Sequence, residues 1–127
     1  MNLLVVDDEK DQLESLRRGL RSKGYRVLEA LAAGEALEHL KRKDNEIGMV
    51  LLDYAMPGMN GMELLENIRK AYGSLPVIIM SAYAEKNMLF EALHNHCDGF
   101  IEKPFTLNRL VQEIERVKSG MLSGDKK

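Results

Sequence analysis

Short apolar runs that end at an acidic or polar residue are the feature that most restricts how this chain can fold. Leu3–Val6 is followed by Asp7, and Met49–Leu52 is followed by Asp53. Uniformly apolar runs of this length are typical of strands that are buried on both faces of a parallel sheet. Amphipathic segments with helical spacing lie between the runs. The pattern therefore predicts an α/β protein in which strands and helices alternate.

Five strands and five helices are predicted in alternation. The predicted strands are Leu3–Val6, Arg26–Ala30, Met49–Leu52, Val77–Met80 and Phe100–Ile101. The apolar positions of the predicted helices lie within Leu13–Leu20, Ala36–Leu40, Met62–Ile68, Glu85–His94 and Leu107–Val117. The second strand is half polar, which favours a place near the edge of the sheet.

Polar side chains stand where four of the predicted strands end. These residues are Asp7, Asp8 and Glu9 after the first strand, Asp53 after the third, Ser81 after the fourth and Lys103 after the fifth. In a parallel sheet of this kind, ligands bind at the carboxyl ends of the strands. Clustered carboxylates repel one another unless a cation lies among them, and Mg²⁺ prefers such oxygen ligands. With a lysine and a serine nearby, the set suits phosphoryl transfer, in which a carboxylate can be the nucleophile.

Composition narrows the possible functions. The chain has 127 residues, the size of one domain, and a net charge of -2, which argues against nucleic-acid binding. Its apolar runs are too short to cross a membrane, and Met1–Val6 lacks the pattern of a signal peptide. A single cysteine, Cys97, allows no internal disulfide and favours a cytoplasmic location. We expect one domain over residues 1–118, followed by a flexible tail or the start of a linker over 119–127.

Four segments together resemble the receiver domain of two-component response regulators, the CheY-like superfamily. They are LLVVDDE (3–9), VLLDYAMPGMNGMELL (50–65), VIIMSA (77–82) and FIEKPF (100–105). The resemblance covers about residues 2–118. It implies a flavodoxin-like, doubly wound (βα)5 fold with a five-stranded parallel sheet in the order 2-1-3-4-5.

The resemblance also assigns roles to residues of the expected site. Asp53 matches the phosphoacceptor. Asp8, Asp53 and the main-chain carbonyl of Ala55 match the ligands of Mg²⁺ (or Mn²⁺), and Asp7 matches an acid that holds the metal through water. Ser81 and Lys103 match the groups that contact the phosphate.

Further roles implied by the resemblance concern switching. Phe100 matches the switch aromatic, although the family more often has Tyr there. The Lys103–Pro104 peptide bond matches a cis bond of the family. Ala82 and Tyr83 stand where they would tune the site, and Tyr83 over the phosphate would slow its hydrolysis.

Two further local features follow from comparing the sequence with the family. Gly61 is expected to supply a turn with positive φ before the helix that follows the phosphoacceptor. The segment His94–Cys97 departs from the small residues that the family usually has at the end of the fourth helix. Its two histidines and one cysteine are types of metal ligand, but consecutive residues rarely converge on one metal ion, which argues against a metal site here.

The expected function is that of a phosphorylated switch and not of an enzyme with a separate substrate. A sensor histidine kinase or a phosphotransfer protein would supply the phosphoryl group. The face made by the fourth helix, fifth strand and fifth helix would then bind an effector or a second receiver. Whether the chain is a stand-alone regulator or part of a longer one stays open.

Three alternative functions fit the sequence less well. A pseudo-receiver that only binds partners would not need the intact acids, Ser81 and Lys103. An aspartyl phosphohydrolase dependent on Mg²⁺ would carry a second acid two residues after its nucleophile, but Tyr54 and Ala55 follow Asp53. A flavin protein would have a phosphate-binding loop after the first strand, where this chain is acidic.

Overall fold

The computed structural model describes residues 1–54, 61–82 and 97–123. The strands are β1 (Asn2–Val6), β2 (Arg26–Ala30), β3 (Ile47–Asp53), β4 (Val77–Ala82) and β5 (Gly99–Lys103). The helices are α1 (Lys10–Ser22), α2 (Ala33–Lys41), α3 (Gly61–Ala71) and α5 (Leu107–Ser123), with a short 3-10 helix η1 (Lys43–Asn45). The helix expected over 85–94 lies outside the described residues.

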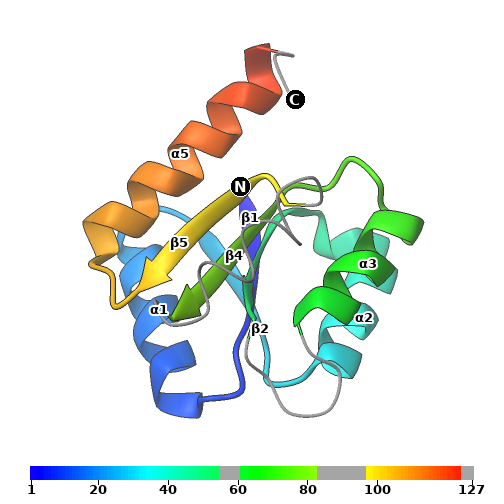
Figure 1. The fold of residues 1–127 in the computed structure, drawn as a ribbon, viewed down its shortest axis with the longest axis horizontal. Helices are drawn as coiled ribbons and strands as arrows, with labels where there is room; N and C mark the ends of the chain where they lie inside the picture. The colour runs from blue at the N-terminus through cyan, green and yellow to red at the C-terminus, as the bar shows by residue number, and fades with distance from the viewer. Residues whose placement is uncertain (55–60, 83–96, 124–127) are drawn as a thin grey trace.

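The five strands form one parallel sheet in the order β2-β1-β3-β4-β5. This confirms the fold expected from the resemblance, and it places the half-polar β2 at an edge. Figure 1 shows the strands running in one direction, so that their carboxyl ends share one edge of the sheet. The register pairs Asp53 with Met80 and Ser81 with Glu102 across neighbouring strands.

Helices cover both faces of the sheet. In Figure 1, α1 and α5 lie on one side and α2 and α3 on the other. Successive side chains of a strand point to opposite faces. Thus Leu3 and Val5 of β1 pack in the core beneath α1 and α5, whereas Leu4 and Val6 pack beneath α2 and α3.

The strands extend further than the apolar runs that predicted them. β3 includes Asp53, β4 includes Ser81, and β5 runs over Gly99–Lys103 instead of two residues only. Backbone hydrogen bonds continue through these polar residues because pairing does not depend on the side chain. The site residues are therefore held within or directly after the strands.

The last helix also differs from the expectation. The helical stripe predicted an element that ends near residue 118, but α5 continues to Ser123. Figure 1 shows its final turns extending past the end of the sheet. The division of the chain at residue 118 stays a prediction.

Among the helices of the described residues, we find none with the length and apolar character needed to span a membrane.

Candidate functional site

Three aspartates meet at the carboxyl edge of the sheet. Asp7 and Asp8 follow β1, and Asp53 ends β3, its neighbour in the sheet. Each side chain offers one carboxylate oxygen, and these oxygens lie within 4.8 Å of one another. Asp7 and Asp53 are buried and Asp8 is exposed, so the cluster opens to solvent on one side. The structure thus brings together the three acids that the sequence singled out.

Asp7 is the most enclosed of the three. Its side chain is 0% exposed, and its Oδ1 accepts the backbone N–H of Glu9 at 2.9 Å. Its Oδ2 is buried and has no hydrogen-bond partner among the described residues. Burial raises the pKa of Asp7, and the Glu9 N–H and the charge of Lys103 only partly oppose this. A buried carboxylate oxygen without a donor favours a cation nearby.

Lys103 stands at the end of β5 and reaches across β4 to Asp53. Its Nζ lies 3.2 Å from Oδ1 of Asp53 and 3.5 Å from Oε1 of Gln12 on α1. The Lys103 side chain is 22% exposed and that of Asp53 is 5% exposed, so this ion pair is shielded from water more than a surface pair. The resemblance implied a cis bond between Lys103 and Pro104, and this bond is cis.

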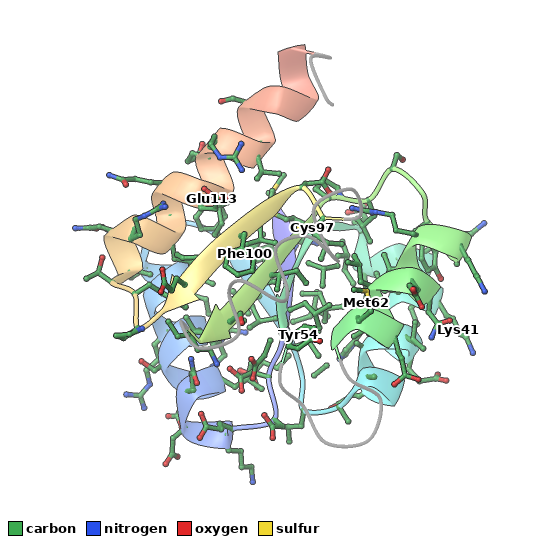
Figure 2. The ribbon with its side chains drawn as sticks, in the orientation of Figure 1. Lys41, Tyr54, Met62, Cys97, Phe100 and Glu113 are labelled. Atoms are coloured by element: carbon green, nitrogen blue, oxygen red, sulfur yellow. The ribbon has the colours of Figure 1, made fainter. Side chains whose placement is uncertain are left out.

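Ser81 and Phe100 lie on neighbouring strands. Ser81, on β4, is 1% exposed and lies one residue beyond Met80, the partner of Asp53. Phe100, on β5, is half-buried and packs against the core beneath α2 and α3 (Figure 2). The switch roles that the resemblance implies for these two residues stay predictions.

The glycine that begins α3 is explained by close packing. A Cβ at Gly61 would lie 2.7 Å from Cα of Tyr54 and 3.2 Å from the carbonyl oxygen of Asp53. The Gly61 N–H donates to the Tyr54 carbonyl at 2.9 Å. The requirement visible here is a close approach of two backbones, and not the positive-φ turn that the sequence predicted.

Several predicted residues lie outside the described part of the chain. They are Ala55, Tyr83 and residues 94–96, and the side chain of Ala82 is likewise not described. Cys97 is described and half-buried, and burial raises the pKa of its thiol to about 11. Because the thiolate is the reactive form, this thiol is poorly suited to a nucleophilic role at neutral pH.

Two residues of interest were not identified from the sequence. Gln12 contacts Lys103 from α1, and Glu113 of α5 is buried against β5. Gln12 stands one residue before the apolar position Leu13, and Glu113 one residue before Ile114. Their position beside the apolar stripe was the only available signal, because the partners are distant in sequence.

The fold and the acid cluster together define a doubly wound α/β protein with an acidic site at the carboxyl edge of its sheet. Comparison with known families is consistent with this class: the response regulator receiver domain model matches residues 3–115. The chain therefore belongs to the family of response regulator receiver domains.

Individual relatives differ in length. Chemotaxis protein CheY-3 of Vibrio cholerae is 33% identical over 120 residues, which cover 92% of this chain and 91% of that protein. The putative two-component response regulator ARR21 of Arabidopsis thaliana is 38% identical over 104 residues, covering 82% of this chain but 17% of the relative. The chain spans 48% of the transcriptional regulatory protein PrrA of Mycobacterium bovis, at 34% identity over 89% of this chain.

Solved structures show the same architecture. A response regulator receiver domain protein from Clostridium thermocellum superposes with a TM-score of 0.86 at 28% identity, covering 95% of this chain and 98% of the other. NtrX from Brucella abortus superposes with a TM-score of 0.87 at 31% identity, covering 98% of this chain and 28% of the other. Receiver domains thus occur both as nearly whole proteins and as parts of longer ones.

Proposed function

We propose that this receiver domain accepts a phosphoryl group on Asp53 and that Mg²⁺ (or Mn²⁺) assists the transfer. The observation that carries the proposal is the cluster of three carboxylate oxygens within 4.8 Å, with Lys103 against the Asp53 carboxylate. Asp8, Asp53 and the main-chain carbonyl of Ala55 would hold the cation, with Asp7 binding through water.

The donor set fits a hard divalent cation. All the proposed ligands are oxygens, and a buried oxygen of Asp7 lacks a hydrogen-bond donor among the described residues. When bound, such a cation neutralises charge on the acids and on the transferring phosphoryl group. Lys103 supplies one positive charge to the cluster, which by itself does not balance three carboxylates.

Besides the cation, the chain would contribute three side chains of this edge to the transfer, namely Asp53, Lys103 and Ser81. A carboxylate oxygen of Asp53 attacks the phosphorus atom, and the bond from phosphorus to the donor breaks. The electron pair of that bond leaves with the donor, for example onto the imidazole nitrogen of a phosphohistidine. Lys103 and Ser81 donate hydrogen bonds to phosphoryl oxygens as the charge shifts onto them. The chain is the acceptor, so it undergoes one modification and does not turn over a separate substrate.

The phosphoryl group then shifts the equilibrium between two conformations of the domain. It adds about −1.5 to −2 charge and new acceptor oxygens next to Ser81 and Lys103. Ser81 moving toward the phosphate would leave space for Phe100 to turn inward. The surface formed by the expected fourth helix, β5 and α5 would change, and this surface would bind an effector or a second receiver. The phosphoryl donor is expected to be a sensor histidine kinase or a phosphotransfer protein.

Intact-mass spectrometry after treatment with acetyl phosphate tests this function. We expect one added phosphoryl group with Mg²⁺, none with EDTA and none in Asp53→Asn. Asp44→Asn is the matched control, because Asp44 is an exposed acid on η1. This short helix precedes β3 and so lies at the amino ends of the strands, away from the acid cluster. It should be phosphorylated like the unmodified chain.

A folded sample without any adduct, and without binding of the phosphate mimic beryllofluoride, would contradict the proposal. The domain would then be a pseudo-receiver that acts by binding alone. Turnover of an external phosphate ester would instead indicate a phosphohydrolase.

A further inference from the structure

The ammonium group of Lys103 is shared between two oxygens from different elements. One is Oδ1 of Asp53 on β3, at 3.2 Å, and the other is Oε1 of Gln12 on α1, at 3.5 Å. A lysine ammonium has three N–H donors and no acceptor. The contacts with Asp53 and Gln12 occupy two of these donors. Within the residues that the structure describes, one donor is then left for an incoming phosphoryl oxygen.

The chemistry of the ammonium fixes the orientation of the Gln12 amide. Because Lys103 can only donate, the carbonyl end of the amide must face it and the amino end must face away. Gln12 is half-buried and lies in the first turn of α1. The chain entering α1 is held by the bond from the Glu9 N–H to Asp7, so the acid cluster also places the helix that carries Gln12.

We propose that Gln12 is a positioning residue for phosphoryl transfer and acts by holding Lys103 beside Asp53. The inference rests on the proposed function of Asp53 as phosphoacceptor. A flexible lysine side chain loses rotamer entropy when it is fixed in the position where it can meet a phosphoryl oxygen. A neutral acceptor on α1 restricts the ammonium in advance and does not compete with the phosphate as a carboxylate would.

A substitution at Gln12 can separate the positioning of Lys103 from a contribution to the stability of the fold. The exposed acids around it, such as Asp11, do not contact Lys103 in the described part of the chain. Methionine has nearly the same length and shape as glutamine but no strong acceptor. A substitution of Gln12 by methionine therefore removes the contact with Lys103 and leaves the packing of α1 nearly unchanged.

The experiment is a double-substitution cycle on the rate of phosphorylation by acetyl phosphate. The rate is followed by intact mass at saturating Mg²⁺ for the unmodified chain, Gln12→Met, Lys103→Ala and the double variant. We expect Gln12→Met to slow phosphorylation about fivefold, the size of one typical hydrogen bond, because the contact with Lys103 is a long one at 3.5 Å. In the Lys103→Ala background the same substitution should have no further effect, because residues that act through one contact are not additive.

Two controls make the result specific. Gln112→Met places the same substitution at an exposed glutamine of α5 and should leave the rate unchanged. Thermal unfolding and Mg²⁺ affinity of Gln12→Met should match those of the unmodified chain, because Gln12 is not among the acids of the cluster.

An unchanged rate in Gln12→Met would overturn the inference while leaving phosphorylation of Asp53 established. Equal slowing in the presence and absence of Lys103 would overturn it as well, because Gln12 would then act without the lysine. No phosphorylation of the unmodified chain would be a failure of the proposed function itself, and the inference would fall with it.

Discussion

Glu113 is a buried carboxylate that the proposed reaction does not use. Its Oε2 accepts the backbone N–H of Phe100 at 3.1 Å and Nη2 of Arg116 at 2.8 Å. Its Oε1 accepts Nε of Arg116 at 3.1 Å. Figure 2 shows Glu113 on α5 beside β5 and Phe100. The carboxylate is 6% exposed, and these donors compensate for its loss of water.

Replacement of Glu113 is expected to destabilise the fold. Glu113→Ala leaves the Phe100 N–H without its acceptor and should lower the free energy of unfolding by about 2 kcal/mol. Glu113→Gln keeps an acceptor and should cost about 1 kcal/mol. Urea unfolding measures both, and hydrogen exchange at the Phe100 amide should be faster in the alanine variant. Arg18→Ala is the control, because it removes an exposed pair with Glu14 and should cost under about 0.5 kcal/mol.

The stabilisation by Glu113 should depend on pH. Burial raises the pKa of Glu113, but Arg116, the Phe100 N–H and Arg109 together outweigh burial and hold it below its ordinary value of 4.5. A lowered folded-state pKa contributes stability above the unfolded-state pKa, and this is lost as the pH falls through the folded-state value. The gap in stability between the unmodified chain and Glu113→Gln should therefore shrink below pH 4.5. A gap that is constant down to acid unfolding would contradict this assignment.

At the scale of elements, the edge strand β5 is tied to helices on both faces of the sheet. Arg116 of α5 donates to the Asp98 carbonyl at 3.1 Å, and Arg69 of α3 donates to Asp98 Oδ2 at 2.6 Å. The same Oδ2 accepts the backbone N–H of Val77, at the start of β4, at 2.9 Å. Asp98 therefore links α3 to α5 at the amino end of β5. These contacts satisfy the Asp98 carbonyl, directly before β5, and the Val77 N–H at the start of β4.

The spacing between β3 and α3 depends on Gly61. A Cβ at Gly61 meets backbone atoms of Tyr54 that cannot move cheaply, so Gly61→Ala should destabilise the fold by about 2 kcal/mol. Gly34, within α2, is the matched control because a Cβ there meets nothing within 4 Å. Gly34→Ala should stabilise the fold by about 0.5–1 kcal/mol. Thermal unfolding of both variants tests the pair, and equal effects would show that crowding at Gly61 is not the cause.

The order of elements was predictable from the sequence, and their ends were less so. Apolar periodicity locates the strands and the described helices because burial produces both signals. It placed only Phe100 and Ile101 in the last strand, since Glu102 and Lys103 continue it through backbone pairing alone. It also missed the extension of α5 to Ser123. Helix and strand ends follow from backbone hydrogen bonds, which the apolar pattern does not record.

At the scale of the whole molecule, the sequence predicted those site residues that stand at the ends of strands. Asp7, Asp53 and Lys103 lie far apart in sequence, but parallel strands bring their carboxyl ends to one edge. Their individual roles came from the resemblance. The contact between Gln12 and Lys103 was not predictable, because it depends on how α1 packs across the end of the sheet. Side-chain partners set by packing between layers leave no local signal in the sequence.

The acid cluster should make the stability of the molecule depend on Mg²⁺. Without a cation, burial raises the pKa of Asp7 above its ordinary value of 3.8. A raised folded-state pKa means that stability is highest below the unfolded-state value and falls as the pH rises through the folded-state value. At pH 7 in EDTA, Asp7→Asn should therefore be about 1 kcal/mol more stable than the unmodified chain, because the buried charge is gone.

Addition of Mg²⁺ should reverse this order. Ligand at a hundredfold excess over its Kd stabilises the folded state by about 2.7 kcal/mol, so the melting temperature of the unmodified chain should rise. Asp7→Asn should gain less, because it has lost one acid of the cluster. Asp44→Asn, at the amino ends of the strands, should gain as much as the unmodified chain. Thermal unfolding with and without Mg²⁺ gives all three shifts. An equal shift in Asp7→Asn would mean that Asp7 takes no part in holding the cation.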